Sequence, residues 1–214
     1  MKRLIATTSL IAISVLAAAC ADPAADKPKA ATASAAAEST YTKPAGAETL
    51  ALSPESSKIE FIGAKVTASH NGSFTRFSGG IDFVPDKPEA SRVTIDIDLA
   101  SVVTDDERLT GHLKSPDFFD VAKYQKATFI STDIKAGGDG GATHTITGNL
   151  DLHGVKKSLS FPARLEVTPL AVAVNSEFAI NRKEFGILYP GKVDDLIRDD
   201  VVIKLSIKAP RGKA

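Results

Sequence analysis

The chain contains 214 residues, and its 26 lysines and arginines balance its 26 aspartates and glutamates, so the formal net charge is zero. This balance, and the lack of a basic cluster interleaved with aromatic residues, argue against a nucleic-acid-binding protein. The single cysteine has no second thiol with which to form an intramolecular disulfide, so a folded domain must draw its stability from a hydrophobic core.

The first 19 residues have the organisation of a secretion signal. Lys2 and Arg3 precede an apolar run over residues 4–16, and three alanines follow at 17–19. Cys20 comes directly after these small residues, where a bacterial lipoprotein signal peptidase cleaves and a lipid is attached. We expect residues 1–19 to be removed, Cys20 to be lipidated, and the mature protein to lie in the periplasm, anchored to a membrane. The alternative is an ordinary secretory signal followed by a chance cysteine.

The segment after the cysteine has the composition of a linker. Residues 21–49 are dominated by Ala, Pro, Lys, Ser and Thr, with Tyr41 as the one aromatic residue, so they offer little apolar surface to bury. Pro23, Pro28 and Pro44 argue against a stable helix. We expect residues 20–49 to form a lipidated, flexible tether, residues 50–209 to form one domain, and residues 210–214 to form a tail.

Alternation of apolar and polar residues with a period of two dominates the chain from Leu50 onward. In the clearest run, Val93, Ile95 and Ile97 alternate with Thr94 and Asp96, which is typical of a strand with one buried face. Eight strands are predicted, at residues 58–66, 72–84, 92–99, 127–135, 143–152, 158–167, 170–180 and 201–207.

The connections between these strands favour a closed sheet. Residues 137–141 form a glycine-rich hairpin loop, and Gly79 and Gly80 within a strand pattern indicate a bulge or bend. The longest connection, 101–126, predicts a short helix over 104–113 with Thr104 as its cap. We predict an all-β, eight-stranded antiparallel barrel with this helical excursion between strands 3 and 4, because closure leaves no unpaired edge. A β-sandwich is the alternative.

Four segments, in this order along the chain, resemble the YceI-like family of bacterial proteins. They read SHNGSFTRFSG at 69–79, GHLKSPDFFDV at 111–121 continuing to ATF at 127–129, GNLDLHGVKK at 148–157, and NRKEFGI at 181–187. The resemblance covers residues 53–209, whereas the loop at 189–200 looks like the version found in one subgroup. The resemblance to this family implies a lipocalin-like barrel with an apolar tunnel that holds a long isoprenoid, a quinone tail or a fatty amide.

The ten phenylalanines are the main candidates for the wall of such a tunnel, with core packing as the alternative for each. The residues that we expect to line it are Phe74, Phe77, Phe118, Phe119, Phe129, Phe161 and Phe178. Space for a ligand is indicated by the small residues Gly63, Ala64, Ala163 and Ala179. His70, Arg76 and Arg182 are the candidates for binding a polar head group, because arginine suits phosphate or carbonyl groups. The alternative for the arginines is surface ion pairing.

Metal binding and catalysis find little support in the sequence. The four histidines lack the close spacing of metal ligands, and no phosphate-binding loop, nucleophile elbow or cysteine nucleophile occurs. We therefore expect a non-catalytic, lipid-anchored protein that sequesters or transports an apolar lipid and needs no cofactor beyond that bound isoprenoid or quinone. The alternatives are an interaction protein with a self-filled barrel, or an enzyme acting on a lipid-like substrate. The oligomeric state is left open.

Overall fold

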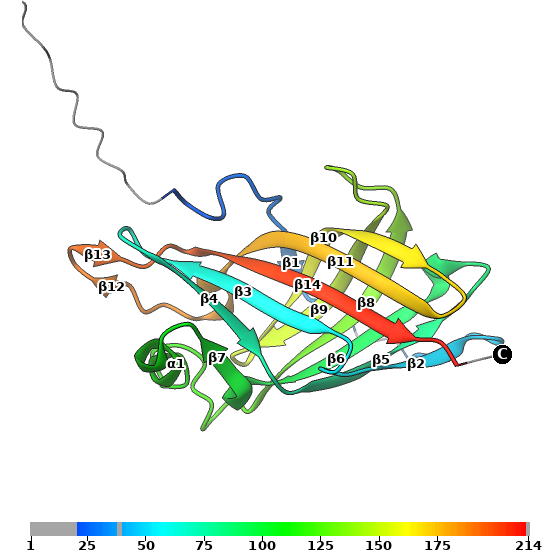
Figure 1. Cartoon of the computed structure of the whole chain (residues 1–214), viewed down its shortest axis with the longest axis horizontal. Helices are drawn as coiled ribbons and strands as arrows, with labels where there is room; N and C mark the ends of the chain where they lie inside the picture. The colour runs from blue at the N-terminus through cyan, green and yellow to red at the C-terminus, as the bar shows by residue number, and fades with distance from the viewer. Residues whose placement is uncertain (1–20, 38–39, 213–214) are drawn as a thin grey trace, which may run out of the picture.

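The strands curl into an antiparallel barrel in the part of the chain that the computed structural model describes, residues 21–37 and 40–212 (Figure 1). The signal segment and Cys20 lie outside these residues. The strands are β1 (Ala31–Ser34), β2 (Glu48–Leu52), β3 (Lys58–Ala64), β4 (Ser69–Phe74), β5 (Phe77–Phe83), β6 (Arg92–Asp98), β7 (Val102–Thr104), β8 (Lys126–Ala136), β9 (His144–Leu152), β10 (Val155–Val167), β11 (Ala171–Asn181), β12 (Gly191–Lys192), β13 (Asp195–Leu196) and β14 (Asp200–Pro210). The helices are α1 (Glu107–Leu113) and the 3-10 turns η1 (Pro88–Ala90), η2 (Leu99–Ser101) and η3 (Arg182–Phe185).

Two bent strand paths close the sheet into a ring. β4 pairs with β3, while β5, its continuation beyond Thr75 and Arg76, pairs with β6, so one bent strand joins the two ends of the sheet. β6 continues into β7 through η2. When each bent path is counted once, the ring of described strands runs β3, β4–β5, β6–β7, β8, β9, β10, β11, β14 and back to β3. The predicted eight-stranded barrel is confirmed, and a sandwich is excluded.

The corner between β4 and β5 lies at Thr75 and Arg76, inside the stretch 72–84 that the pattern predicts as one strand. Their amides donate to the carbonyl (3.2 Å) and hydroxyl (3.0 Å) of Ser101, so the backbone at the corner keeps hydrogen-bond partners. Gly79 does not make the bend. A Cβ at that position would lie 2.1 Å from the carbonyl oxygen of Thr94, so glycine there permits the close approach of β5 to β6.

The helical excursion between the third and fourth predicted strands is confirmed, but its cap differs from the prediction. α1 begins after Asp106, whose carboxylate accepts a hydrogen bond from the Leu109 amide at 2.9 Å. This bond holds the pKa of the Asp106 carboxyl below its usual range. Thr104, the predicted cap, instead ends β7 and pairs with Gly72 of β4, which leaves the capping role to the aspartate.

Residues 21–37, which we call the strap, are docked on the barrel, so this part of the predicted tether is not a free linker. β1 pairs with residues 157–160 of β10, and on its other side the Ala30 amide donates to the Ala179 carbonyl of β11 at 2.9 Å. Ala24 is 2% exposed and packs against Ala179, Val202 and Ile62 on the outer face of the barrel. The strap thus fills the wall between β10 and β11.

A proline in β10 explains the gap that the strap fills. β10 and β11 pair only over residues 164–167 of β10, and Pro162, just before them, has no N–H to donate. The Pro162 carbonyl accepts from the Ser176 hydroxyl at 2.5 Å, so a side chain replaces a ladder hydrogen bond. Beyond this point the strap supplies the backbone partners. The composition of residues 21–37 does not predict this docking, because a strand that pairs with an open sheet edge needs backbone groups more than apolar side chains.

Docking of the strap predicts that trypsin cleaves slowly after Lys29 in the native protein. Lys27 precedes Pro28 and is a poor trypsin site in any conformation. Lys27 forms an ion pair with Glu177 at 3.2 Å, and Lys29 forms one with Asp200 at 2.5 Å. Both lysines therefore lie against the barrel wall, where a protease can reach their backbone only after the strap has opened. A time course of limited proteolysis, followed by mass spectrometry, measures that opening.

The matched variants for this experiment are Ala24→Asp and Ala33→Asp. A carboxylate at position 24 would be buried against Ala179 and Val202, which is costly without a partner. Cleavage should accelerate at least about tenfold, which corresponds to a loss of about 1.4 kcal/mol in docking free energy. Ala33 is exposed, so the same change there should leave cleavage slow. Equally fast cleavage of all three proteins would mean that residues 21–37 form the flexible tether that the composition predicts.

Candidate functional site

The barrel encloses a cavity of about 500 Å³. Its wall consists of the inward-facing side chains of the strands, and along β6 these are Val93, Ile95 and Ile97, as the alternation predicts. Leu50 and Leu52 of β2 are buried with Phe83 in the core and do not line the cavity. Cavities that hold small molecules typically have volumes of about 300–1,000 Å³ and mostly apolar walls. This cavity has the volume and the lining of a ligand site.

Six of the seven phenylalanines predicted to line a tunnel do line the cavity. Phe161 and Phe178, on β10 and β11, stack with ring centroids 4.3 Å apart and an interplanar angle of 13°. The Phe129 ring of β8 lies 5.8 Å from that of Phe161. The six are Phe74, Phe118, Phe119, Phe129, Phe161 and Phe178.

Phe61 of β3 also lines the cavity but is absent from the predicted set. The alternation of Ile59, Phe61 and Gly63 could have placed it on the inner face. Gly72 lies directly opposite on β4, and a Cβ there would come within 2.2 Å of the Phe61 ring. Because Gly72 has no side chain, the Phe61 ring can pack over its backbone at the cavity wall.

The small residues divide into two groups. Gly63 and Ala64 line the cavity, as expected for positions that leave space. Ala163 is buried in the core but does not line the cavity, and Ala179 faces outward onto the strap. The expectation for Ala163 is wrong because alternation gives a face of the sheet but not the height along the barrel. The expectation for Ala179 is wrong because it lies between Phe178 and Ile180, which line the cavity, so alternation places it on the outer face.

Phe77 is the phenylalanine that does not line the cavity. It is buried in the core and, with Arg76, Ile97 and Val121, borders a separate surface depression. The corner at Thr75 and Arg76 redirects the chain between Phe74 and Phe77, so the two rings serve different regions. In one continuous strand over 72–84 these two rings, three residues apart, would face opposite sides of the sheet, so alternation does not support placing both in the cavity.

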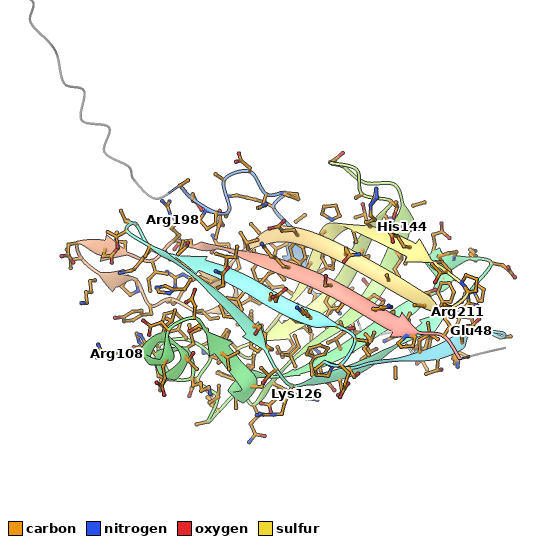
Figure 2. All side chains as sticks on the ribbon, viewed as in Figure 1. Glu48, Arg108, Lys126, His144, Arg198 and Arg211 are labelled. Atoms are coloured by element: carbon orange, nitrogen blue, oxygen red, sulfur yellow. The ribbon has the colours of Figure 1, made fainter. Side chains whose placement is uncertain are left out.

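Polar side chains gather at one end of the cavity, which we call the mouth. Lys65, Lys192 and Arg198 lie there with His112 and Tyr189. The His112 imidazole contacts the Asp117 carboxylate at 2.8 Å (Nε2 to Oδ2) and meets the ring of Tyr189 edge-on at 5.0 Å. The opposite end is tied by an ion pair between Glu48 and Arg211, both labelled in Figure 2. The cavity is thus polar at its mouth and apolar within.

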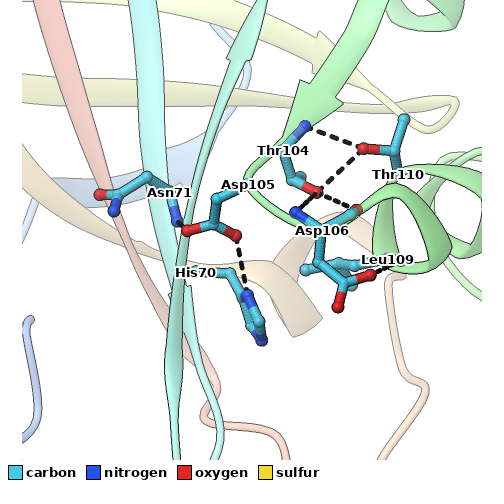
Figure 3. Close-up of polar contacts among 7 residues, drawn as sticks. All are labelled: His70, Asn71, Thr104, Asp105, Asp106, Leu109 and Thr110. Atoms are coloured by element: carbon cyan, nitrogen blue, oxygen red, sulfur yellow. Dashed lines mark hydrogen bonds and ion pairs between the residues drawn. The ribbon is translucent and has the colours of Figure 1, made fainter.

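His70 is the one predicted head-group residue whose position fits that role. It lines the cavity, and its Nδ1 lies 2.8 Å from Oδ1 of Asp105 (Figure 3). The Asn71 amide donates to Oδ2 of the same carboxylate at 2.9 Å. Both bonds lower the pKa of the Asp105 carboxyl below its usual range, and the bond from the Asn71 backbone amide has the larger effect. Asp105 thereby fixes the imidazole at the mouth.

Arg182 contributes to the cavity wall, but its guanidinium is engaged by the protein itself. The residue is 4% exposed, and it donates to the carbonyls of Ile187 (2.7 Å) and Arg198 (3.0 Å). Its remaining bonds reach the Ile197 carbonyl (3.4 Å) and the Asp199 carboxylate (3.3 Å). Burial lowers the pKa of the guanidinium, and Asp199 opposes that shift. The head-group role predicted for Arg182 is not supported, since it fastens the loop over residues 187–199.

Arg76 lies outside the cavity altogether. Its Nε and Nη2 contact the Asp98 carboxylate at 2.9 and 2.8 Å, beside the depression that Phe77 borders. The predicted head-group role is therefore wrong for this residue, and the alternative, a surface ion pair, is what the structure shows. The corner that misplaces Phe77 also carries Arg76 away from the mouth.

Among residues 21–37 and 40–212, no three His, Cys, Asp or Glu side chains gather closely enough to hold a metal ion. No helix within those same residues is long and apolar enough to cross a membrane. The structure brings together six of the predicted phenylalanines and His70, and it separates Phe77 and Arg76 from them.

An eight-stranded antiparallel barrel with an apolar interior and a polar mouth defines a protein of lipocalin-like architecture. The YceI-like domain model matches residues 50–209, and the chain belongs to this family. The UPF0312 proteins of Pseudomonas putida F1 and of Pseudomonas syringae pv. tomato are 33% and 32% identical to it over 140 residues. Each of these alignments covers 63% of this chain and 72% of the relative.

Solved structures share the fold. BcnA of Burkholderia cenocepacia superposes with a TM-score of 0.65 at 24% identity, covering 74% of this chain and 99% of BcnA. A polyisoprenoid binding domain from Saccharophagus degradans superposes with a TM-score of 0.60 at 17% identity, covering 77% of this chain and all of that domain. The YCEI protein of Campylobacter jejuni has a TM-score of 0.57 at 24% identity, covering 66% of this chain and 84% of that protein.

Proposed function

We propose that this protein binds one long apolar ligand in its barrel and sequesters or transports it without catalysing a reaction. The ligand classes are an isoprenoid, an isoprenoid quinone and a fatty amide. The observation that carries the proposal is the cavity of about 500 Å³ walled by Phe, Leu, Ile and Val side chains. The shared fold of the Saccharophagus degradans polyisoprenoid binding domain supports the same ligand class.

Burial alone can supply the affinity for such a ligand. Each CH₂ group removed from water contributes about 0.8 kcal/mol, so ten groups contribute about 8 kcal/mol before the costs of ordering. At the mouth, His70, His112 and Tyr189 offer hydrogen-bonding groups to a polar head. The apolar interior sets the class of ligand, and the mouth sets its orientation.

The experiment that tests this proposal identifies what the purified protein carries. The chain should begin at Ala21, because the strap completes the barrel wall, and should be extracted with organic solvent for mass spectrometry. We expect one isoprenoid, quinone or fatty amide per protein. A barrel that is empty, and that takes up neither farnesol, a short isoprenoid quinone nor oleamide, would overturn the proposal in favour of an interaction protein. Chemical conversion of a bound lipid by the protein would favour the alternative that it is an enzyme acting on a lipid-like substrate.

We also propose that the protein is held at a membrane in the periplasm by a lipid on Cys20. The expected result for Cys20→Ser is loss of the protein from the membrane fraction, because the acyl chains supply most of the membrane affinity. A Ser14→Ala variant, changed within the signal but away from the cysteine, should remain in the membrane fraction. Unchanged fractionation of Cys20→Ser would remove the anchor from the proposal.

A further inference from the structure

Four exposed apolar side chains surround the mouth of the cavity. Val193 is 97% exposed, Leu188 63%, Leu196 49% and Val66 48%. We call these four residues the rim. Exposed apolar side chains are ordinary when scattered, but a group of them on one surface indicates an interaction site.

Backbone contacts show that the rim is one continuous surface. The Val66 amide donates to the Leu196 carbonyl at 3.1 Å, which joins the turn after β3 to the β12–β13 hairpin. Val193 lies in the turn of that hairpin, whose strand residues Lys192 and Asp195 line the cavity. Leu188 precedes Tyr189, which lines it too. In Figure 1 the hairpin lies at one end of the barrel, and the turn between β10 and β11 lies at the other.

Two ion pairs lie on this surface, and the exposed Lys192 and Asp194 flank Val193 in the hairpin turn. Lys65 bonds the Asp195 carboxylate and holds its pKa below the usual range. Arg198 pairs with Asp22 of the strap at 3.1 Å. Paired charges lower the cost of bringing the rim to an apolar phase, since neither charge is left without a partner when water is removed. Tyr189 beside the rim belongs to the residue types that favour the boundary between a bilayer and water.

The N-terminal end of the strap lies beside the mouth of the cavity. Asp22 contacts Arg198 at the mouth, and Figure 2 shows Arg198 where the described chain begins. Cys20 precedes Asp22 by two residues, and two residues span at most about 7 Å. A lipid attached to Cys20 would therefore enter a bilayer beside the rim, not at the far end of the barrel.

We propose that the rim is a membrane-docking surface, and that its partner is a phospholipid bilayer. Val66, Leu188, Val193 and Leu196 enter the boundary between head groups and acyl chains, so the mouth of the cavity opens directly onto the membrane. This inference rests on the proposed function, because it gives the path by which an apolar ligand passes between bilayer and barrel without crossing water.

The chain contains no tryptophan, so a single introduced tryptophan reports its own environment. Val193→Trp places this reporter in the rim, and Leu170→Trp places it at a residue that is 72% exposed in the turn between β10 and β11. Both variants, in the full lipidated chain, are added to vesicles of phosphatidylethanolamine and phosphatidylglycerol with and without brominated acyl chains. We expect the emission of the tryptophan at position 193 to shift to the blue and to lose at least half its intensity to the bromine, and that of the tryptophan at position 170 to change little.

Equal quenching of both tryptophans, or quenching of neither, would overturn the proposal, and in the second case the rim is a surface for another protein. A second pair of variants guards against a local effect of the indole. In the chain that begins at Ala21, which carries neither the signal nor the lipid, Val193→Asp should lower binding to the same vesicles at least fivefold, whereas Leu170→Asp should not. Loss of rim insertion with the cavity ligand still present rejects only the docking surface. Rim insertion by a chain that carries no ligand and takes up none of the added lipids keeps the docking surface and rejects the proposed function.

Discussion

Replacing Arg182 by alanine is expected to lower the free energy of unfolding by about 3–5 kcal/mol, which would make it among the most damaging single changes in the barrel. The guanidinium donates to the buried carbonyl of Ile187 and to the partly buried carbonyls of Ile197 and Arg198, and its removal leaves all three without this donor. Lysine should not restore stability, because an ammonium group cannot reach several carbonyls with a planar fork. Urea unfolding followed by circular dichroism measures the change.

Arg76→Ala is the matched control for this measurement. Its partner Asp98 is accessible to water, and an exposed ion pair contributes only about 0–1 kcal/mol. The two alanine variants should therefore differ clearly in their unfolding midpoints. If Arg182→Ala were as stable as Arg76→Ala yet lost its bound lipid, the guanidinium would be a head-group ligand and our structural assignment of it would fail.

Replacing Gly63 by phenylalanine is expected to reduce ligand occupancy at least about tenfold, which corresponds to about 1.4 kcal/mol of binding free energy. Gly63 lines the cavity, and a Cβ built there meets no atom within 4 Å. The new side chain can therefore occupy space that the ligand would otherwise fill, without displacing the wall. Solvent extraction and mass spectrometry of equal amounts of each protein give the occupancy.

Gly111→Phe is the control for this change. Gly111 lies on the exposed side of α1, where an added Cβ also meets nothing within 4 Å, so the same substitution leaves the cavity untouched. Its lipid content should equal that of the original protein. Equal occupancy in Gly63→Phe would mean that the ligand does not use this part of the cavity.

The larger elements of the barrel could be predicted because they depend on local pattern. Alternation along β6 gave its inner face directly, since successive side chains of a strand point to opposite sides of the sheet. The same argument placed Phe161 and Phe178 inside, and the YceI-like segments added the barrel topology. Phe61 was within reach of this rule, because it alternates with Ile59 and Gly63 in the predicted strand.

The polar residues could not be assigned in this way. Sequence marks Arg76 and Arg182 as cations within family-like segments, but a guanidinium binds whichever acceptors lie nearest in space. For Arg182 these are carbonyls of residues 187–198, which the loop brings back over the barrel, and for Arg76 the acceptor is Asp98 across a corner. Both outcomes depend on where the chain turns, and the alternation pattern does not show the turn at Thr75.

Local pattern was enough to predict the eight strand paths of the ring and the apolar character of the interior, though not β1, β2 or β7, because these paths follow from side-chain alternation between neighbours in the chain. Contacts between distant segments were needed to establish that the strap fills the wall between β10 and β11, that Phe77 leaves the cavity, and that the rim gathers at its mouth. These features join residues far apart in sequence, such as Ala30 with Ala179, and their energies come from backbone groups and contacts that no local pattern records.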